Sequence, residues 1–148
     1  MKENSSQQLH MLRYTLTEQL IHGMEVSNLA YDLARELGYE KEICYELAKA
    51  GVLHDIGKIG IDEKILNKPG RLTVEEFNEM KKHTLIGASM LSKMERYKEE
   101  PLIHIAYQIC RWHHERYDGS GYPDGLVGDE IPISAQIVSL ADVYDALI

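Results

Sequence analysis

The sequence predicts an all-α protein with a single domain, and three observations support this fold class. Apolar residues recur every three to five positions through most of the 148 residues, which is the period of helices with one buried face. Glycine, proline and capping signals separate these stretches at only a few places. A composition of 44% hydrophobic and 27% charged residues is typical of a folded domain of this length. We therefore expect a bundle of about five to seven helices.

The first two helices are expected in the N-terminal third of the chain. A polar segment, residues 1–11, precedes a first helix that begins at Leu12 and ends at Gly38, a residue type common just after helices. A second helix should run from Glu40 to about Ile56, where glycines break the pattern. The apolar residues of the first helix are Leu12, Leu16, Leu20, Met24, Leu29, Leu33 and Leu37.

Later helices are predicted from their start signals. A turn at residues 67–70 precedes Thr73–Glu76, whose spacing is that of a capping box opening a third helix. Pro101 suits the first position of another helix, which should run to His113 and His114. Residues 116–132 are rich in Gly, Pro and Asp and predict a long loop, after which Pro132 opens the last helix.

The chain is acidic, with a formal net charge of −8, and this bears on its partners. Binding to DNA or RNA polymers depends on many Lys and Arg residues, so no such partner is expected. The first ten residues lack the apolar run of a secretory signal, and no stretch reaches membrane-spanning length. Cys44 and Cys110 lie in apolar segments without CxxC spacing and are interpreted as buried thiols. These features predict a cytoplasmic protein without a membrane span.

Histidines and acidic residues on the predicted helices form a set of candidate metal ligands. His54 and Asp55 are adjacent at the expected end of the second helix, where both side chains can reach one ion. Taken alone, this pair is equally consistent with a capping Asp beside a His at the core edge. Each further candidate has an ordinary alternative as a surface pair, a dipole partner or a hydrogen-bonded core residue. The further candidates are Glu18 and His22, spaced i and i+4, with His83, His113, His114 and Asp142.

Metal binding accounts for the whole set, because several unpaired imidazoles and carboxylates would be costly in a helical core. Histidine and carboxylate ligands without cysteine favour iron, manganese or zinc. The candidates exceed what one ion uses, so two or three divalent ions are expected, bridged by a carboxylate such as Asp55. Paired ions suit phosphoryl chemistry, and Lys58, one turn after Asp55, can reach phosphate oxygens. The alternative for Lys58 is a solvated surface residue.

Three motifs resemble those of one known family. They are HDIGKIGI at residues 54–61, His83-Thr84, and HHERYDGSGYPDGL at residues 113–126. Together they resemble the HD-GYP family of bacterial cyclic dinucleotide phosphodiesterases, a subclass of the HD metal-dependent phosphohydrolases. The resemblance implies an HD-domain-like helical bundle at residues 12–148, with a glycine-rich GYP loop.

The resemblance also implies a role for each candidate ligand. Asp55 would bridge two ions, and Glu18 matches a ligand of those members that hold three. The ions would be iron or manganese. The remaining ligands would be His22, His54 and Asp142 for one ion, and His83, His113 and His114 for another.

Catalytic and substrate-binding roles follow from the same resemblance. His54, Asp55 and Lys58 would be the catalytic residues, and a metal-bridging hydroxide would attack phosphorus. The substrate would be cyclic di-GMP, opened to pGpG and in some members cut again to GMP. The substrate contacts would be Lys58, Gly121, Tyr122 and Pro123, with Gly119 allowing a close backbone approach.

Two alternatives to this function remain at the level of sequence. One is an HD phosphohydrolase acting on another nucleotide, such as cyclic GMP-AMP, and the other is a non-catalytic dinucleotide-binding or interaction module. In the family, the last helix continues past the match to residues 145–147 into basic phosphate-binding residues, whereas this chain stops at Ile148. A domain truncated at its C-terminal end is therefore expected. A homodimer and a sensory domain in a longer parent protein are both compatible with the sequence.

Overall fold

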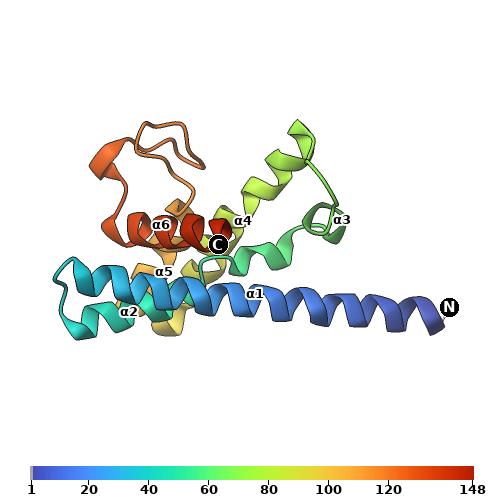
Figure 1. Cartoon of the computed structure of the whole chain (residues 1–148), viewed down its shortest axis with the longest axis horizontal. Coiled ribbons are helices and arrows are strands. Elements are labelled where there is room, and N and C mark those ends of the chain that lie inside the picture. Colours follow the sequence, from blue (N-terminus) through green and yellow to red (C-terminus); the bar gives the residue numbers. More distant parts are fainter. Residues whose placement is uncertain (1) are drawn as a thin grey trace.

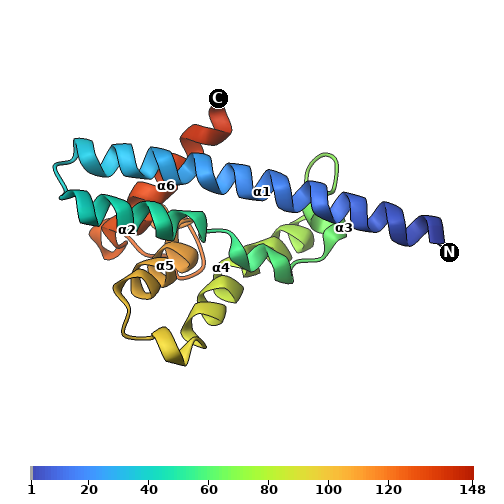
Figure 2. The same ribbon diagram turned by 90° about the horizontal axis from the view of Figure 1, so that it is seen from below.

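The chain folds into a helical bundle (Figures 1 and 2). The computed structural model describes the backbone of residues 2–148 and the side chains from Thr17 onward. Among these residues there is no β-strand, and a single isolated bridge joins Asp118 to Val127, so the all-α fold class is confirmed. The elements are α1 (Lys2–Glu36), α2 (Lys41–Val52), η1 (Ile56–Gly60), α3 (Glu63–Leu66), α4 (Val74–Ser92), η2 (Glu95–Tyr97), α5 (Pro101–Trp112), η3 (Gly128–Glu130) and α6 (Ile133–Leu147), where η marks a 3₁₀ helix.

Helix α1 is longer than the apolar pattern predicted. It begins at Lys2 rather than Leu12 and extends past the other helices at its N-terminal end (Figure 2). Lys, Glu and Gln near its start are good helix formers, and a polar segment such as residues 2–8 has no apolar period from which a helix could be predicted. The predicted apolar positions Leu12 and Leu16 lie outside the residues whose side chains are described, and the domain boundary at residue 12 stays a prediction.

The turn after α1 reverses the chain so that α2 packs antiparallel against it (Figure 1). Helix α1 ends at Glu36, and Gly38 follows with a φ of 90°, a left-handed conformation that favours glycine. The amide of Gly38 donates to the carbonyl of Arg35, which caps the last turn. The predicted glycine stop of this helix is therefore confirmed.

Helix α2 ends earlier than predicted, and this matters for the site. It stops at Val52, so His54 and Asp55 lie in a turn between α2 and η1 rather than in the last helical turn. The backbone here changes from i→i−4 to i→i−3 hydrogen bonds, with the amide of His54 donating to Gly51 and that of Lys58 donating to Asp55. This tighter winding was not visible in the apolar pattern, because both helix types bury residues at similar spacing.

Local start signals of the later helices were predicted correctly. Thr73 and Glu76 form the full capping box of α4: the amide of Glu76 donates to Thr73 Oγ1 at 3.1 Å, and the amide of Thr73 donates to Glu76 Oε1 at 2.8 Å. Pro101 opens α5, and Pro132 is the N-cap of α6. The one-turn helix α3, capped by Asp62, was not predicted, because four residues are too few to show a period.

The core lies where α1, α2, α5 and α6 meet, and small side chains let these helices approach closely. Both cysteines are buried and free, as predicted, and burial raises the pKa of the Cys110 thiol to about 12. Across the described residues, no helix combines the length and apolar character that a membrane span requires. The buried core residues include Val26, Ala30, Ala34, Cys44, Leu47, Ala50, Leu91, Ala106, Ile109, Cys110, Ile137, Val138 and Ala141.

Candidate metal centre

Histidine and aspartate side chains from five parts of the chain converge beside this core. They form two groups, and within each group the potential ligand atoms all lie within 4.8 Å of one another. Asp55 is the only residue common to both groups among the described residues. The first group is Asp55, His83, His113 and His114, and the second is His22, His54, Asp55 and Asp142.

The packing of the helices explains why residues so distant in sequence meet. His22 on α1 and Asp142 on α6 face each other where these two helices contact, with His22 Nε2 2.7 Å from Asp142 Oδ1. His83 lies on α4, which packs against η1 directly after Asp55. His113 is the C-cap of α5, and its Nε2 lies 3.3 Å from Asp55 Oδ1.

Backbone hydrogen bonds orient three of the imidazoles toward Asp55. The Nδ1 atoms of His54, His83 and His113 each lie 2.7 Å from a backbone carbonyl, those of Gly51, Met80 and Ile109 respectively. A carbonyl only accepts, so each Nδ1 must carry the proton that it donates. In the neutral imidazole this leaves a lone pair on each Nε2, and these atoms lie 3.0 to 3.3 Å from the Asp55 carboxylate.

This arrangement fits a bound cation. In the described part of the chain, the Nε2 atoms of these three histidines and Oδ1 of Asp55 are buried and have no hydrogen-bond partner. Lone pairs that face one another in a buried site are costly, and divalent ions held by the two groups would satisfy all of them. Nitrogen and oxygen donors without sulfur suit iron, manganese and zinc. The two groups therefore suggest metal binding.

The electrostatics of the site keep Asp55 ionised. Burial favours a neutral carboxyl, but the imidazoles of His113, His54 and His83 outweigh it and hold the pKa of Asp55 far below its usual range. Burial likewise opposes a charged His54, but the carboxylates of Asp142 and Asp55 raise its pKa to about 10. Without an ion, a proton on His54 offsets these two carboxylates, and a bound metal would have to displace that proton.

Two other histidines are held neutral. Burial, followed by the imidazoles of His113 and His83, lowers the pKa of His114 to about 3. Burial also lowers the pKa of His113. Neutral imidazole is the form that binds metal ions, so both residues are in the required state at neutral pH.

Asp145 supports the second group, and sequence reasoning did not identify it as a site residue. Its Oδ2 lies 2.7 Å from His22 Nδ1, while Nε2 of the same ring faces Asp142. A carboxylate on the far nitrogen fixes the ring orientation and increases the basicity of a histidine ligand. Its position three residues after Asp142, on the same face of α6, was the available sequence signal.

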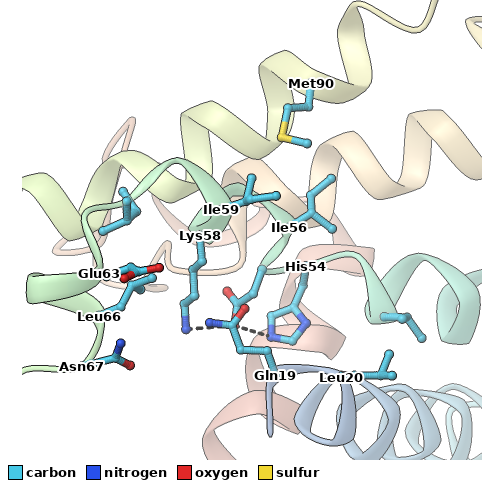
Figure 3. A pocket seen from close by; sticks show the side chains of 13 residues that line it. Gln19, Leu20, His54, Ile56, Lys58, Ile59, Glu63, Leu66, Asn67 and Met90 are labelled. Atoms are coloured by element: carbon cyan, nitrogen blue, oxygen red, sulfur yellow. Dashed lines mark ion pairs between the residues drawn. The ribbon is translucent and has the colours of Figure 1, made fainter. Parts of the chain in front are cut away.

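Two further candidate residues, Lys58 and Glu18, belong to neither ligand group. Lys58 projects into the site, with Nζ 3.2 Å from Asp55 Oδ2, and its contact with a phosphate stays a prediction (Figure 3). Glu18 is exposed on α1 and belongs to neither group. A third ion bound by Glu18 stays a prediction.

The GYP loop, residues 116–132, lies against the first group. The ring of Tyr122 stacks on that of His114, with centroids 4.9 Å apart and planes 15° apart, and the Tyr122–Pro123 peptide bond is cis. A Cβ at Gly121 would lie 2.3 to 2.5 Å from backbone atoms of residues 114–116, so only glycine fits there. Gly119 has a φ of 84°, which also favours glycine.

Glu115 anchors this loop, and it too was missed in the sequence. Its side chain is buried, and its carboxylate accepts hydrogen bonds from the amides of Asp124, Gly125 and Leu126 at 2.6, 3.1 and 3.0 Å. Asp124 is held further by two hydrogen bonds from the Arg111 guanidinium. These contacts draw the far side of the loop onto the end of α5 and so help to place Tyr122.

Replacing Glu115 by Ala should loosen the loop without removing the metal centre. Three loop amides would lose their acceptor, so we expect the free energy of unfolding to fall by about 3 kcal/mol. Amide hydrogen exchange at residues 124–126 should accelerate, while metal content should not change. The matched control is Glu99→Ala, at an exposed glutamate that precedes α5. Unchanged exchange at residues 124–126 would refute the anchoring role.

A helical bundle that holds two His/Asp groups sharing one aspartate is typical of an HD-type metal-binding domain. A profile of the family described as HD domain matches residues 3–148. The chain therefore belongs to the HD-domain family. Its relatives and motifs are those of the HD-GYP type within that family.

Similar proteins support this grouping. The cyclic di-GMP phosphodiesterase response regulator RpfG of Xanthomonas campestris is 47% identical over 123 residues, which are 83% of this chain and 32% of that protein. The 3′3′-cGAMP-specific phosphodiesterase 2 of Vibrio cholerae is 40% identical over 126 residues, 85% of this chain and 23% of that protein. The solved structure of Bd1817, an HDG"Y"P protein from Bdellovibrio bacteriovorus, matches with a TM-score of 0.70 and 28% identity, covering 87% of this chain and 40% of Bd1817.

The matches cover most of this chain but a smaller share of the other proteins. The chain spans between 21% and 33% of the length of four curated relatives that it matches. The shared region is therefore the domain that carries the HD and GYP motifs.

Proposed function

We propose that the chain is a metal-dependent phosphodiesterase domain that hydrolyses cyclic di-GMP to pGpG. The observation that carries the proposal is the position of Asp55, common to two adjacent His/Asp groups and bordered by the GYP loop. Two ligand groups that share a carboxylate are suited to a pair of ions acting on one phosphate. Several relatives named as cyclic di-GMP phosphodiesterases support the choice of substrate.

Metal binding, phosphate binding and substrate contact would be carried out by different residues of the chain. The two groups would hold two divalent ions, iron or manganese, which when bound activate water and stabilise the charge that develops on phosphate. Lys58 would bind a phosphate oxygen as a compact cation. Tyr122, held against His114 by the loop, would contact the substrate at the other side of the centre. We also expect the protein to act in the cytoplasm.

A second candidate substrate is 3′3′-cGAMP, favoured by the similarity to a phosphodiesterase named as specific for it. The metal chemistry is the same for both dinucleotides, because the bond that breaks is a phosphodiester in each. The identities favour cyclic di-GMP, since four relatives named for it are 47 to 55% identical and a fifth is 39% identical, against 36 to 40% for three cGAMP-specific proteins. A third candidate is a module that binds the dinucleotide without turnover.

Metal-loaded protein should convert cyclic di-GMP to a linear product, and chelation of the ions should abolish the reaction. We expect kcat/KM for cyclic di-GMP to exceed that for 3′3′-cGAMP by about tenfold, or 1.4 kcal/mol. The assay uses protein reconstituted with Fe(II) or Mn(II) without oxygen, and mass spectrometry identifies the products. Faster cutting of 3′3′-cGAMP would favour the second candidate. Tight binding of cyclic di-GMP with no product would favour the third.

A further inference from the structure

A pocket of about 410 Å³ opens beside the metal centre, and the metal-ligand groups account for only one edge of it. Its walls come from α1, the turn after α2, η1, α3 and α4 (Figure 3). A volume of this size is within the range of about 300–1,000 Å³ found for small-molecule sites. The pocket is large enough for one heterocyclic base with its sugar outside.

The walls of this pocket are mostly aliphatic. They include Ile56, Leu66 and, from α4, Met90. Ile59 is 77% exposed and Leu20 is 57% exposed, so the pocket presents apolar surface to solvent. Covering such surfaces with a flat ring removes them from water and favours binding.

One edge of the pocket is the metal centre itself. His54 and Asp55 line it, and Lys58 projects along it with its Nζ beside Asp55 (Figure 3). A nucleotide whose phosphate lies at Lys58 and the two ligand groups would therefore direct its base into the pocket.

The opposite edge carries the groups that can read a base. Glu63 and Asn67 lie at positions i and i+4 along α3 and its C-cap, away from His54 in Figure 3. In the described part of the chain Glu63 forms no ion pair, and an ionised carboxylate only accepts hydrogen bonds. Guanine offers two adjacent donors on its Watson–Crick edge, N1–H and the N2 amine. Adenine presents an N1 acceptor there, which a carboxylate would repel.

We propose that this pocket is a guanine subsite and that Glu63 is its specificity-determining residue. The carboxylate of Glu63 accepts from N1 and N2 of guanine, while the aliphatic walls cover the ring. The proposal rests on the proposed function, because a phosphate at the metal centre is what directs the base into the pocket.

The test compares GMP with AMP as binding probes, using calorimetry on the metal-loaded protein, and cyclic di-GMP with cyclic di-AMP as substrates. Glu63→Gln replaces an acceptor-only group by an amide that can also donate to adenine, so the preference for guanine should fall about tenfold. Glu75→Gln, at an exposed glutamate of α4 outside the pocket, should leave the preference unchanged. Ile59→Ala should weaken GMP and AMP binding alike, without changing their ratio.

Metal content should be the same in all three variants and in the parent protein, because none of the three residues belongs to a metal-ligand group. Equal affinity for GMP and AMP in the parent protein, or an unchanged ratio in Glu63→Gln, would overturn the subsite. If cyclic di-GMP is hydrolysed while that ratio is unchanged, the proposed function stands and the subsite fails. If no cyclic dinucleotide is hydrolysed but Glu63→Gln still reduces the preference for GMP, the subsite stands and the proposed function fails.

Discussion

Asp55→Asn should empty both ligand groups at once and lower the hydrolysis of cyclic di-GMP by on the order of a thousandfold, about 4 kcal/mol of transition-state stabilisation. Asp55 is the shared member of the two groups, and its Oδ1 is buried among the Nε2 atoms of His83 and His113. An amide has the same shape but no charge, and it brings an N–H₂ group toward atoms that would otherwise bind an ion. Both ions should therefore be lost together.

Metal content measured by mass spectrometry, alongside kcat and KM, separates this result from simple unfolding. Circular dichroism should show an intact helical fold, because the core of α1, α2, α5 and α6 does not depend on Asp55. Asp32→Asn, at an exposed aspartate of α1, is the matched control and should keep the metal content and activity of the parent protein. A variant at Asp55 with full metal content and full turnover would contradict the proposed centre.

The second large effect is expected at Gly57, where η1 passes directly over α4. A Cβ on this residue would lie 1.8 Å from the His83 carbonyl oxygen and 2.6 Å from the Gly87 amide nitrogen. Both neighbours are helix backbone, which cannot rotate away as a side chain can. Gly57→Ala should therefore push η1 off α4 and lower the free energy of unfolding by about 3 kcal/mol or more.

The same displacement should weaken metal binding, because Asp55 precedes η1 and His83 lies on α4. Urea denaturation followed by circular dichroism, with and without added Mn(II), measures both effects. Gly51→Ala is the control: its Cβ would meet Ser27 and Val138 at 3.7 Å, an ordinary contact, and alanine is the better helix former. Equal urea midpoints of unfolding for Gly57→Ala and the parent protein would show that the close approach of η1 to α4 does not matter for stability.

Prediction from the sequence was most successful for helix ends that are marked by residues within one short segment. The capping box at Thr73, Pro101 at the start of α5, and the glycine after α1 act through neighbouring residues, so their effects are visible in the order of residues. The candidate ligands were also visible, since a histidine or an aspartate in an apolar helical stretch needs a partner. The start of α1 and the end of α2 were placed wrongly, because apolar spacing does not resolve polar or 3₁₀ turns.

The order of residues was thus sufficient to predict an all-α bundle, the family motifs and a set of ligands rich in histidine. Only the packed chain divides those ligands into two groups joined by Asp55, leaves Glu18 outside both, and brings in Asp145 and Glu115. These features depend on distances between helices such as α1 and α6, whose residues His22 and Asp142 are far apart in sequence. The sequence shows which residues could bind a metal ion. Only the tertiary contacts determine which of their atoms face each other.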